Sequence, residues 1–131
     1  MNDKQKELVK YFEKRVNYHF YEVFKLYDYE LEVSKQTKSG CRASAYWHDI
    51  ETGAQASTIC WSEEWINETP IKEEVDKVAF HECAEVLLAE LQELVQARYI
   101  QKRDLTMAVH RVIRKLENGV FEKLKDKNNT Q

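Results

Sequence analysis

Hydrophobic residues recur every three or four positions through the first part of the chain. Over about residues 3–25 this spacing places them on one helix face, while Lys and Glu fill most other positions. The pattern predicts an amphipathic helix. Its apolar positions are Leu8, Val9, Phe12, Val16, Phe20, Val23 and Phe24.

The period then changes to two. Apolar and polar residues alternate over residues 27–34 and again over residues 41–49, and a third such segment covers residues 54–61. Turn residues separate them, at Lys38-Ser39-Gly40 and at Glu51-Thr52-Gly53. Three consecutive strands with short turns predict an antiparallel meander.

Helical patterns return after the strands. Thr69-Pro70 predicts a helix start, with Thr as N-cap and Pro at the first helical position. Glu73 and Glu74 would then lie near the positive end of the helix dipole. We expect this long helix to run to about Tyr99 and a last helix to begin near Asp104.

The last helix is expected to bury one side and to end near Asn118-Gly119, a C-terminal cap signal. Its inner positions are Leu105, Ala108, Val109, Val112, Ile113 and Leu116. We expect the polar residues 125–131 to form a frayed tail. The sequence therefore predicts one α+β domain over residues 1–124, built from an N-terminal helix, a three-stranded meander, a long helix and a C-terminal helix.

Composition and charge narrow the class of protein. Of the 131 residues, 43% are hydrophobic and 33% charged, which is typical of a soluble globular chain. The net charge of −3 gives no overall basic surface for nucleic acid. No apolar run reaches the roughly 18 residues of a membrane-spanning helix. Because the first residues are polar and the three cysteines lack CxxC spacing, we expect a cytoplasmic protein that is not exported.

A cluster of ionisable residues interrupts the apolar part of the long helix. Residues 78–88 include His81, Glu82 and Glu85. An unpaired carboxylate on an apolar face costs several kcal/mol, so such groups usually have a counter-charge, a hydrogen-bond network or a metal. His81 and Glu85 stand four positions apart and can converge on a single ion. Glu82 lies beside them, turned by about 100° around the helix.

The order of elements, with His81-Glu82-x-x-Glu85 on the long helix, resembles the zincins and in particular small zincin-like proteins of phages and prophages. In that family two His of HExxH bind zinc, and the Glu is general base for a zinc-bound water. The resemblance implies that His81 is a metal ligand and that Glu82 is the catalytic base. Glu85 replaces the second His; a carboxylate can still bind zinc, but it makes the bound water less acidic and weakens hydrolysis.

The resemblance also implies a third ligand from the last helix, where VIRKLEN at residues 112–118 is similar to the phage proteins. His110 is the candidate and Glu117 the reserve. His81 and Glu85 should then face a concavity between the long and last helices. The implied cofactor is zinc or another divalent metal, and the implied activity is that of a metallohydrolase or peptidase. Strand 54–61 would be the edge strand that pairs with an extended peptide.

Interpretations without zinc stay open. His81 can pair with Glu85, and the two Glu side chains can pair with Arg111 or Arg114 across the helices. The chain would then be a metal-free zincin-like scaffold that binds a host or phage protein. Alternatively, Glu82 and Glu85 hold magnesium for a nucleotide, as in all-helical pyrophosphatases, but the predicted strands argue against that fold.

Two further residues are assigned to packing. His19 falls on the apolar side of the first helix and is expected to be a packed histidine. Cys83 faces away from His81 on the helix wheel, so we expect a small core residue and not a nucleophile.

Overall fold

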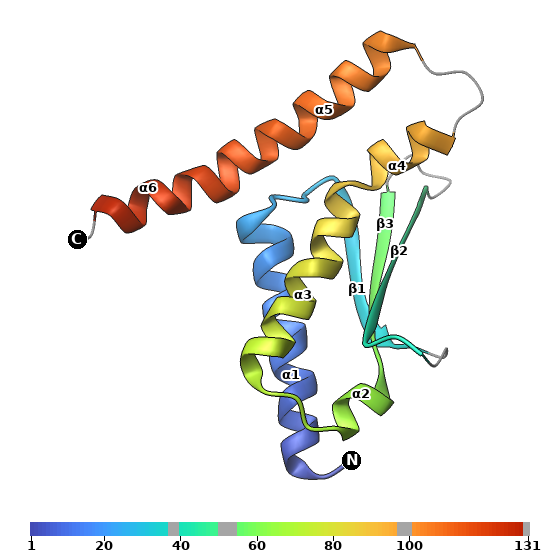
Figure 1. Ribbon diagram of the computed structural model, residues 1–131, viewed down its shortest axis with the longest axis vertical. Coiled ribbons are helices and arrows are strands. Elements are labelled where there is room, and N and C mark those ends of the chain that lie inside the picture. Colours follow the sequence, from blue (N-terminus) through green and yellow to red (C-terminus); the bar gives the residue numbers. More distant parts are fainter. Residues whose placement is uncertain (37–39, 50–54, 97–100, 130–131) are drawn as a thin grey trace.

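Two helices, α1 (Asp3–Asn17) and α3 (Lys72–Leu87), lie side by side against a three-stranded sheet (Figure 1). This computed structural model describes residues 1–36, 40–49, 55–96 and 101–129. Helix α1 continues as a short π-helical segment, η1 (Tyr18–Val23), which confirms the predicted first helix. The mixed α+β class is confirmed as well.

The sheet consists of β1 (Tyr29–Lys35), β2 (Ala43–Asp49) and β3 (Gln55–Trp61). Its order is β1-β3-β2, with β1 parallel and β2 antiparallel to β3. The three strands are confirmed, but the meander order is wrong, and strand 54–61 is central instead of being an edge strand. Burial explains the order: β3 carries the fully buried Ile59, whereas β1 carries the exposed Glu30 and Glu32, which suit an edge.

The core fills the space between the sheet and helices α1 and α3. Its largest fully buried side chains include Phe12, Val16, Phe20, Leu26, Ile59, Ile66, Val75 and Val86. Cys83 of α3 is also fully buried, with its thiol 3.5 Å from the Val16 carbonyl oxygen. Burial raises the pKa of this thiol, so Cys83 is a core residue as expected.

Helix α3 begins two residues later than Thr69-Pro70 predicts. Thr69 has a φ of 56°, and its N–H donates to the carbonyl of Ile66. It therefore closes the short helix α2 (Glu63–Asn67) and cannot cap the next one; Ile71 takes the N-cap position without a side-chain bond. The single long helix is also interrupted at Leu88, after which α4 covers Ala89–Gln96. Residues 97–99 of the expected helix lie outside the described part.

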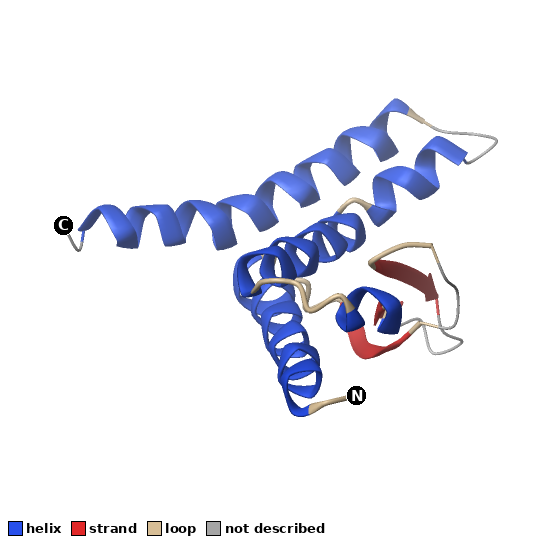
Figure 2. Cartoon of the chain, turned by 60° about the horizontal axis from the view of Figure 1, so that its bottom comes forward, coloured by secondary structure: helices blue, strands red, loops and turns tan. Residues whose placement is uncertain are grey.

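The C-terminal helices α5 (Lys102–Leu116) and α6 (Glu122–Asn129), joined by the π-helical segment η2 (Glu117–Phe121), form one rod that projects from the body (Figures 1 and 2). The predicted end at Asn118-Gly119 is wrong, and helix continues into the predicted tail. Gly119 is buried against the main chain of Val23, and a Cβ atom there would overlap the Val23 carbonyl. The glycine therefore permits a close approach and does not end the helix.

Most of the predicted inner face of α5 is not buried. Ala108 is fully buried and Val112 packs on the core, as expected. The exceptions, Leu105, Val109, Ile113 and Leu116, are between 37% and 43% exposed. Ion pairs attach α5 to the body: Arg111 binds Glu90 of α4, and Lys115 binds Asp28 at 2.9 Å. No helix within the described residues is both long and apolar enough to cross a membrane.

Candidate metal centre

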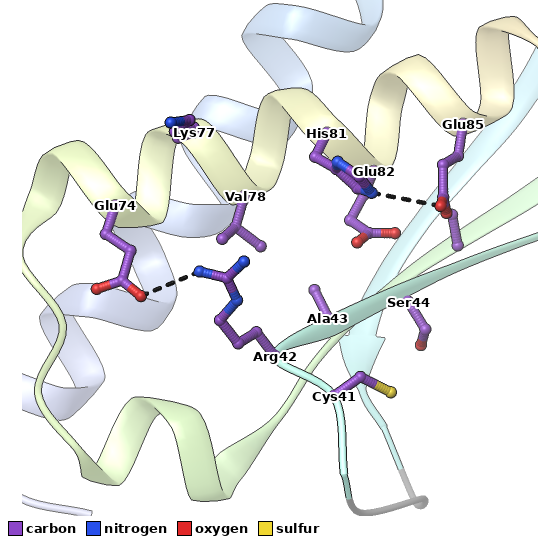
Figure 3. Close-up of a pocket in the computed structure, with 11 residues that line it drawn as sticks. Cys41, Arg42, Ala43, Ser44, Glu74, Lys77, Val78, His81, Glu82 and Glu85 are labelled. Atoms are coloured by element: carbon purple, nitrogen blue, oxygen red, sulfur yellow. Dashed lines mark hydrogen bonds and ion pairs between the residues drawn. The ribbon is translucent and has the colours of Figure 1, made fainter.

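A cleft of about 490 Å³ runs between α3 and the start of β2 (Figure 3). Five consecutive residues, 41–45, line it from the strand side. Cys41 and Arg42 precede β2, and Ala43, Ser44 and Ala45 begin it. Because successive side chains of a strand point to opposite faces, three adjacent strand residues line the cleft along the edge of the strand. In the described sheet β2 pairs with β3 alone, which makes β2 the edge strand beside the helix.

Three residues of α3 bring metal-binding atoms together at this cleft. His81, Glu82 and Glu85 each offer one such atom, and these atoms lie within 4.8 Å of one another. His81 Nε2 is 3.4 Å from Glu85 Oε1, across one helical turn (Figure 3). The spacing of four places both side chains on one face, and Glu82 follows at the next position toward the sheet. The structure therefore brings together three of the four predicted site residues.

Glu82 is the buried member of the cluster. It is only 6% exposed, and its Oε2 has no hydrogen-bond partner among the described residues. Burial, the nearby charge of Glu85 and a hydrogen bond with that carboxyl raise the pKa of Glu82 to about 8. An unpartnered oxygen of this kind, lining a cleft, is a ready ligand for a cation.

The other end of the cleft holds two cations, Arg42 and Lys77, and one carboxylate, Glu74. Arg42 Nη1 donates to Glu74 Oε1 at 3.3 Å, and Trp65 Nε1 donates to the same oxygen at 3.4 Å. Lys77 lines the cleft from α3 and has no ion-pair partner in the described parts of the chain. Arg42 also lowers the pKa of Glu82, against the larger effect of burial. Sequence reasoning missed Arg42, because only the strand order reveals that β2 lies beside α3.

The structure does not bring His110 to the cluster. It is exposed on α5, and its Nδ1 lies 2.9 Å from the Thr106 carbonyl oxygen of its own helix. Neither it nor Glu117 lines the cleft. The prediction of a concavity between the long and last helices is therefore wrong, because the cleft lies between α3 and β2. Helix α5 packs on α4 and projects away from the cluster. The alternative pairing of Arg111 with Glu82 or Glu85 is also wrong, since Arg111 binds Glu90.

The donor set determines which ions the cluster can hold. One imidazole nitrogen and two carboxylates suit zinc and also harder ions such as manganese. Catalytic zinc sites have three protein ligands and one open position. In the described residues Glu82 is the third candidate ligand next to His81 and Glu85, so a three-ligand site requires the buried carboxylate itself.

A second charged cluster lies where α3 meets α1. Asp76 Oδ1 accepts from Arg15 Nε at 2.7 Å and lies 2.6 Å from Nε2 of the buried His19. Burial lowers the pKa of His19, with Asp76 opposing that effect only in part. Burial would raise the pKa of Asp76, but hydrogen bonds from Arg15 and His19 outweigh it, and the pKa is lowered. His19 also packs edge-on against Phe80, which confirms a packed histidine.

No protein-family model, curated protein or solved structure matches this chain.

Proposed function

We propose that this chain is a small zincin-like protein, of the kind found in phages and prophages, that binds one divalent metal ion through His81, Glu82 and Glu85. The observation that carries the proposal is the buried Glu82 carboxyl: it offers an oxygen within 4.8 Å of ligand atoms of His81 and Glu85, and its Oε2 has no hydrogen-bond partner among the described residues. Two adjacent carboxyls in a partly buried cleft repel each other when both are ionised. A divalent cation would remove that repulsion and satisfy the free oxygen.

The surroundings of the cluster fit an ion with an open coordination position. All three candidate ligands come from α3, and the residues across the cleft from them belong to the start of β2. A bound zinc ion would supply Lewis acidity to a ligand or water at that position. The edge of β2 offers main-chain groups for an extended peptide, so the chemistry that fits is metal-assisted peptide hydrolysis or peptide binding at the metal.

Glu82 cannot be both a metal ligand and the general base that the family resemblance implies. We assign it to the metal, because His110 is not near and a third protein ligand is otherwise missing in the described chain. Two carboxylate ligands make a metal-bound water less acidic than His ligands would. We therefore expect weak hydrolytic activity.

The second candidate function is a metal-free scaffold that binds a protein along β2. It is favoured by one observation: His81 and Glu85 already form a pair with each other, which accounts for both side chains without an ion. It leaves Glu82 Oε2 unsatisfied, and for that reason we place it second. In either case the expected location is a reducing cytoplasm.

The test is the metal content of the purified chain and of two histidine variants. Zinc is added to chelator-treated protein, and the zinc retained per chain is measured by elemental analysis after gel filtration. We expect one ion in the parent and in His110→Ala, and loss of the ion in His81→Ala. Both His side chains are exposed, so neither variant should disturb the fold. The proposal is wrong if the parent holds no stoichiometric zinc, or if His81→Ala retains it.

A further inference from the structure

The cleft has two chemically different ends. The potential metal ligands occupy one end, and Arg42 with its partner Glu74 occupies the other (Figure 3). Lys77 of α3 also lines the cleft. With His81 counted as neutral and the carboxyls of Glu74, Glu82 and Glu85 all ionised, the two cations leave the lining with a formal charge of −1. A bound divalent ion would change this to +1. A cleft loaded with metal should therefore attract anionic ligands, and the empty cleft should not.

Arg42 is placed to exchange its partner for a ligand. Among the described residues, its one ion pair is the contact between Arg42 Nη1 and Glu74 Oε1 at 3.3 Å, and the Arg42 side chain is 62% exposed. Its main chain is fixed, because the Arg42 carbonyl accepts from Ser62 N–H at 3.0 Å just before β2 begins. The main chain of Arg42 is held in place and its guanidinium makes one long contact to Glu74. The guanidinium can therefore form a bidentate pair with a carboxylate that enters the cleft.

The strand edge determines what kind of anion fits. A peptide that adds to the outer edge of β2 would run along residues 43–45 between Arg42 and the metal ligands. Its main chain would use the strand's unpaired groups, and alternate side chains would point toward α3. An acidic side chain on that face would enter the cleft that Arg42 and Lys77 line.

We propose that the metal-loaded cleft binds an extended peptide carrying an acidic side chain, with Arg42 as the residue that selects it. This inference rests on the proposed metal site and adds the class of ligand. Metal and acidic peptide strengthen each other's binding, because each compensates the charge that the other adds.

The experiment uses two fluorescein-labelled peptides, acetyl-Ala-Val-Glu-Val-Ala and the same peptide with Gln in place of Glu. Binding to the full chain is followed by fluorescence anisotropy, with zinc and with chelator. We expect the Glu peptide to bind zinc-loaded protein at least tenfold more tightly than the Gln peptide. Arg42→Gln should remove this preference, and Lys10→Gln, which removes an exposed charge of α1 outside the cleft, should keep it.

The outcomes separate the two proposals, because the zinc content of every sample is measured in parallel. If the protein holds zinc but binds both peptides equally, or neither, the acidic-peptide inference is overturned while the metal site stands. An Arg42→Gln variant that keeps the tenfold preference overturns the role of Arg42. A protein without zinc contradicts the proposed function, and a Glu preference that persists in chelator overturns the coupling to metal.

Discussion

His81 Nε2 lies 3.4 Å from Glu85 Oε1, and this pair stands at the exposed side of the cleft. The two side chains are 68% and 44% exposed, so water screens their attraction and the pair contributes little to stability. Glu82 is different, because its carboxyl is buried between them and the sheet. A bound metal would therefore connect His81 and Glu85, which contribute little to stability, with Glu82, whose buried carboxylate destabilises the fold when it is ionised.

The first prediction concerns the pH dependence of the metal-free protein. The folded-state pKa of Glu82 is about 8, against an ordinary value of 4.5, so between these values the folded chain holds a proton that the unfolded chain has released. This contribution to stability is complete below about pH 4.5 and is lost as the pH rises through 8. Glu82→Gln stays neutral, so its free energy of unfolding relative to the parent should rise by roughly 2 to 4 kcal/mol from pH 5 to pH 8.

Urea unfolding in chelator at pH 5, 6, 7 and 8 measures this difference. Glu73→Gln is the control, since it removes an exposed carboxylate from the same helix outside the cleft. A constant difference between Glu82→Gln and the parent at all four pH values would show that the Glu82 carboxyl is not perturbed.

The second prediction concerns the charged cluster on the other side of α3. Asp76→Asn removes the anion that accepts from Arg15 and lies beside His19, so it should lower the free energy of unfolding by about 1 to 3 kcal/mol at pH 7. Because the pKa of His19 and that of Asp76 are both lowered in the folded protein, the contribution of this cluster to stability should decrease as the pH falls below about 6.5, opposite in sign to the contribution of Glu82. If Asp76→Asn is as stable as Glu73→Gln at pH 7, the cluster has no structural role.

The third prediction tests the contact between the C-terminal rod and the body. Gly119→Ala places a Cβ against the carbonyl of Val23, so the rod must shift, at a cost of about 1 to 3 kcal/mol. Asn118→Ala changes an exposed neighbour and should cost much less. Thermal unfolding of the two variants measures the difference; equal melting temperatures would mean that Gly119 does not touch Val23.

The sequence predicts the elements of this fold better than their arrangement. Periodicity is a local property, and it locates the first helix and the three strands well. Strand order depends on which strand buries more surface: β3 contains four buried residues, including Ile59, and β1 contains none, a difference that alternation along each strand does not show. The prediction of a helix end at Asn118-Gly119 is wrong because it also uses local sequence alone. A glycine is required at position 119 by the close approach of Val23, which lies far away in the chain.

For the candidate site, spacing along one helix is enough to predict that His81, Glu82 and Glu85 converge. The partners of this helix are not predictable in the same way. His110 was expected from a resemblance that assumes the last helix packs beside the motif, whereas Arg111 and Lys115 fix that helix elsewhere. No local sequence pattern marks Arg42 as a residue of the site, since its position in the cleft results from the pairing of β2 with β3.

The central claim is that His81, Glu82 and Glu85 form a metal site, and Glu85→His tests it most directly. This change recreates HExxH on α3, and the loss of Glu85 leaves no buried cation unpaired, since the ion-pair partner of Glu85 among the described residues is the exposed His81. The measurement is the melting temperature of parent and variant, each with zinc and with chelator. We predict that zinc raises the melting temperature of both proteins, because an ion bound only to the folded state stabilises it. The increase in the variant should be at least as large as the increase in the parent. Melting temperatures that do not respond to zinc in either protein would contradict the metal site.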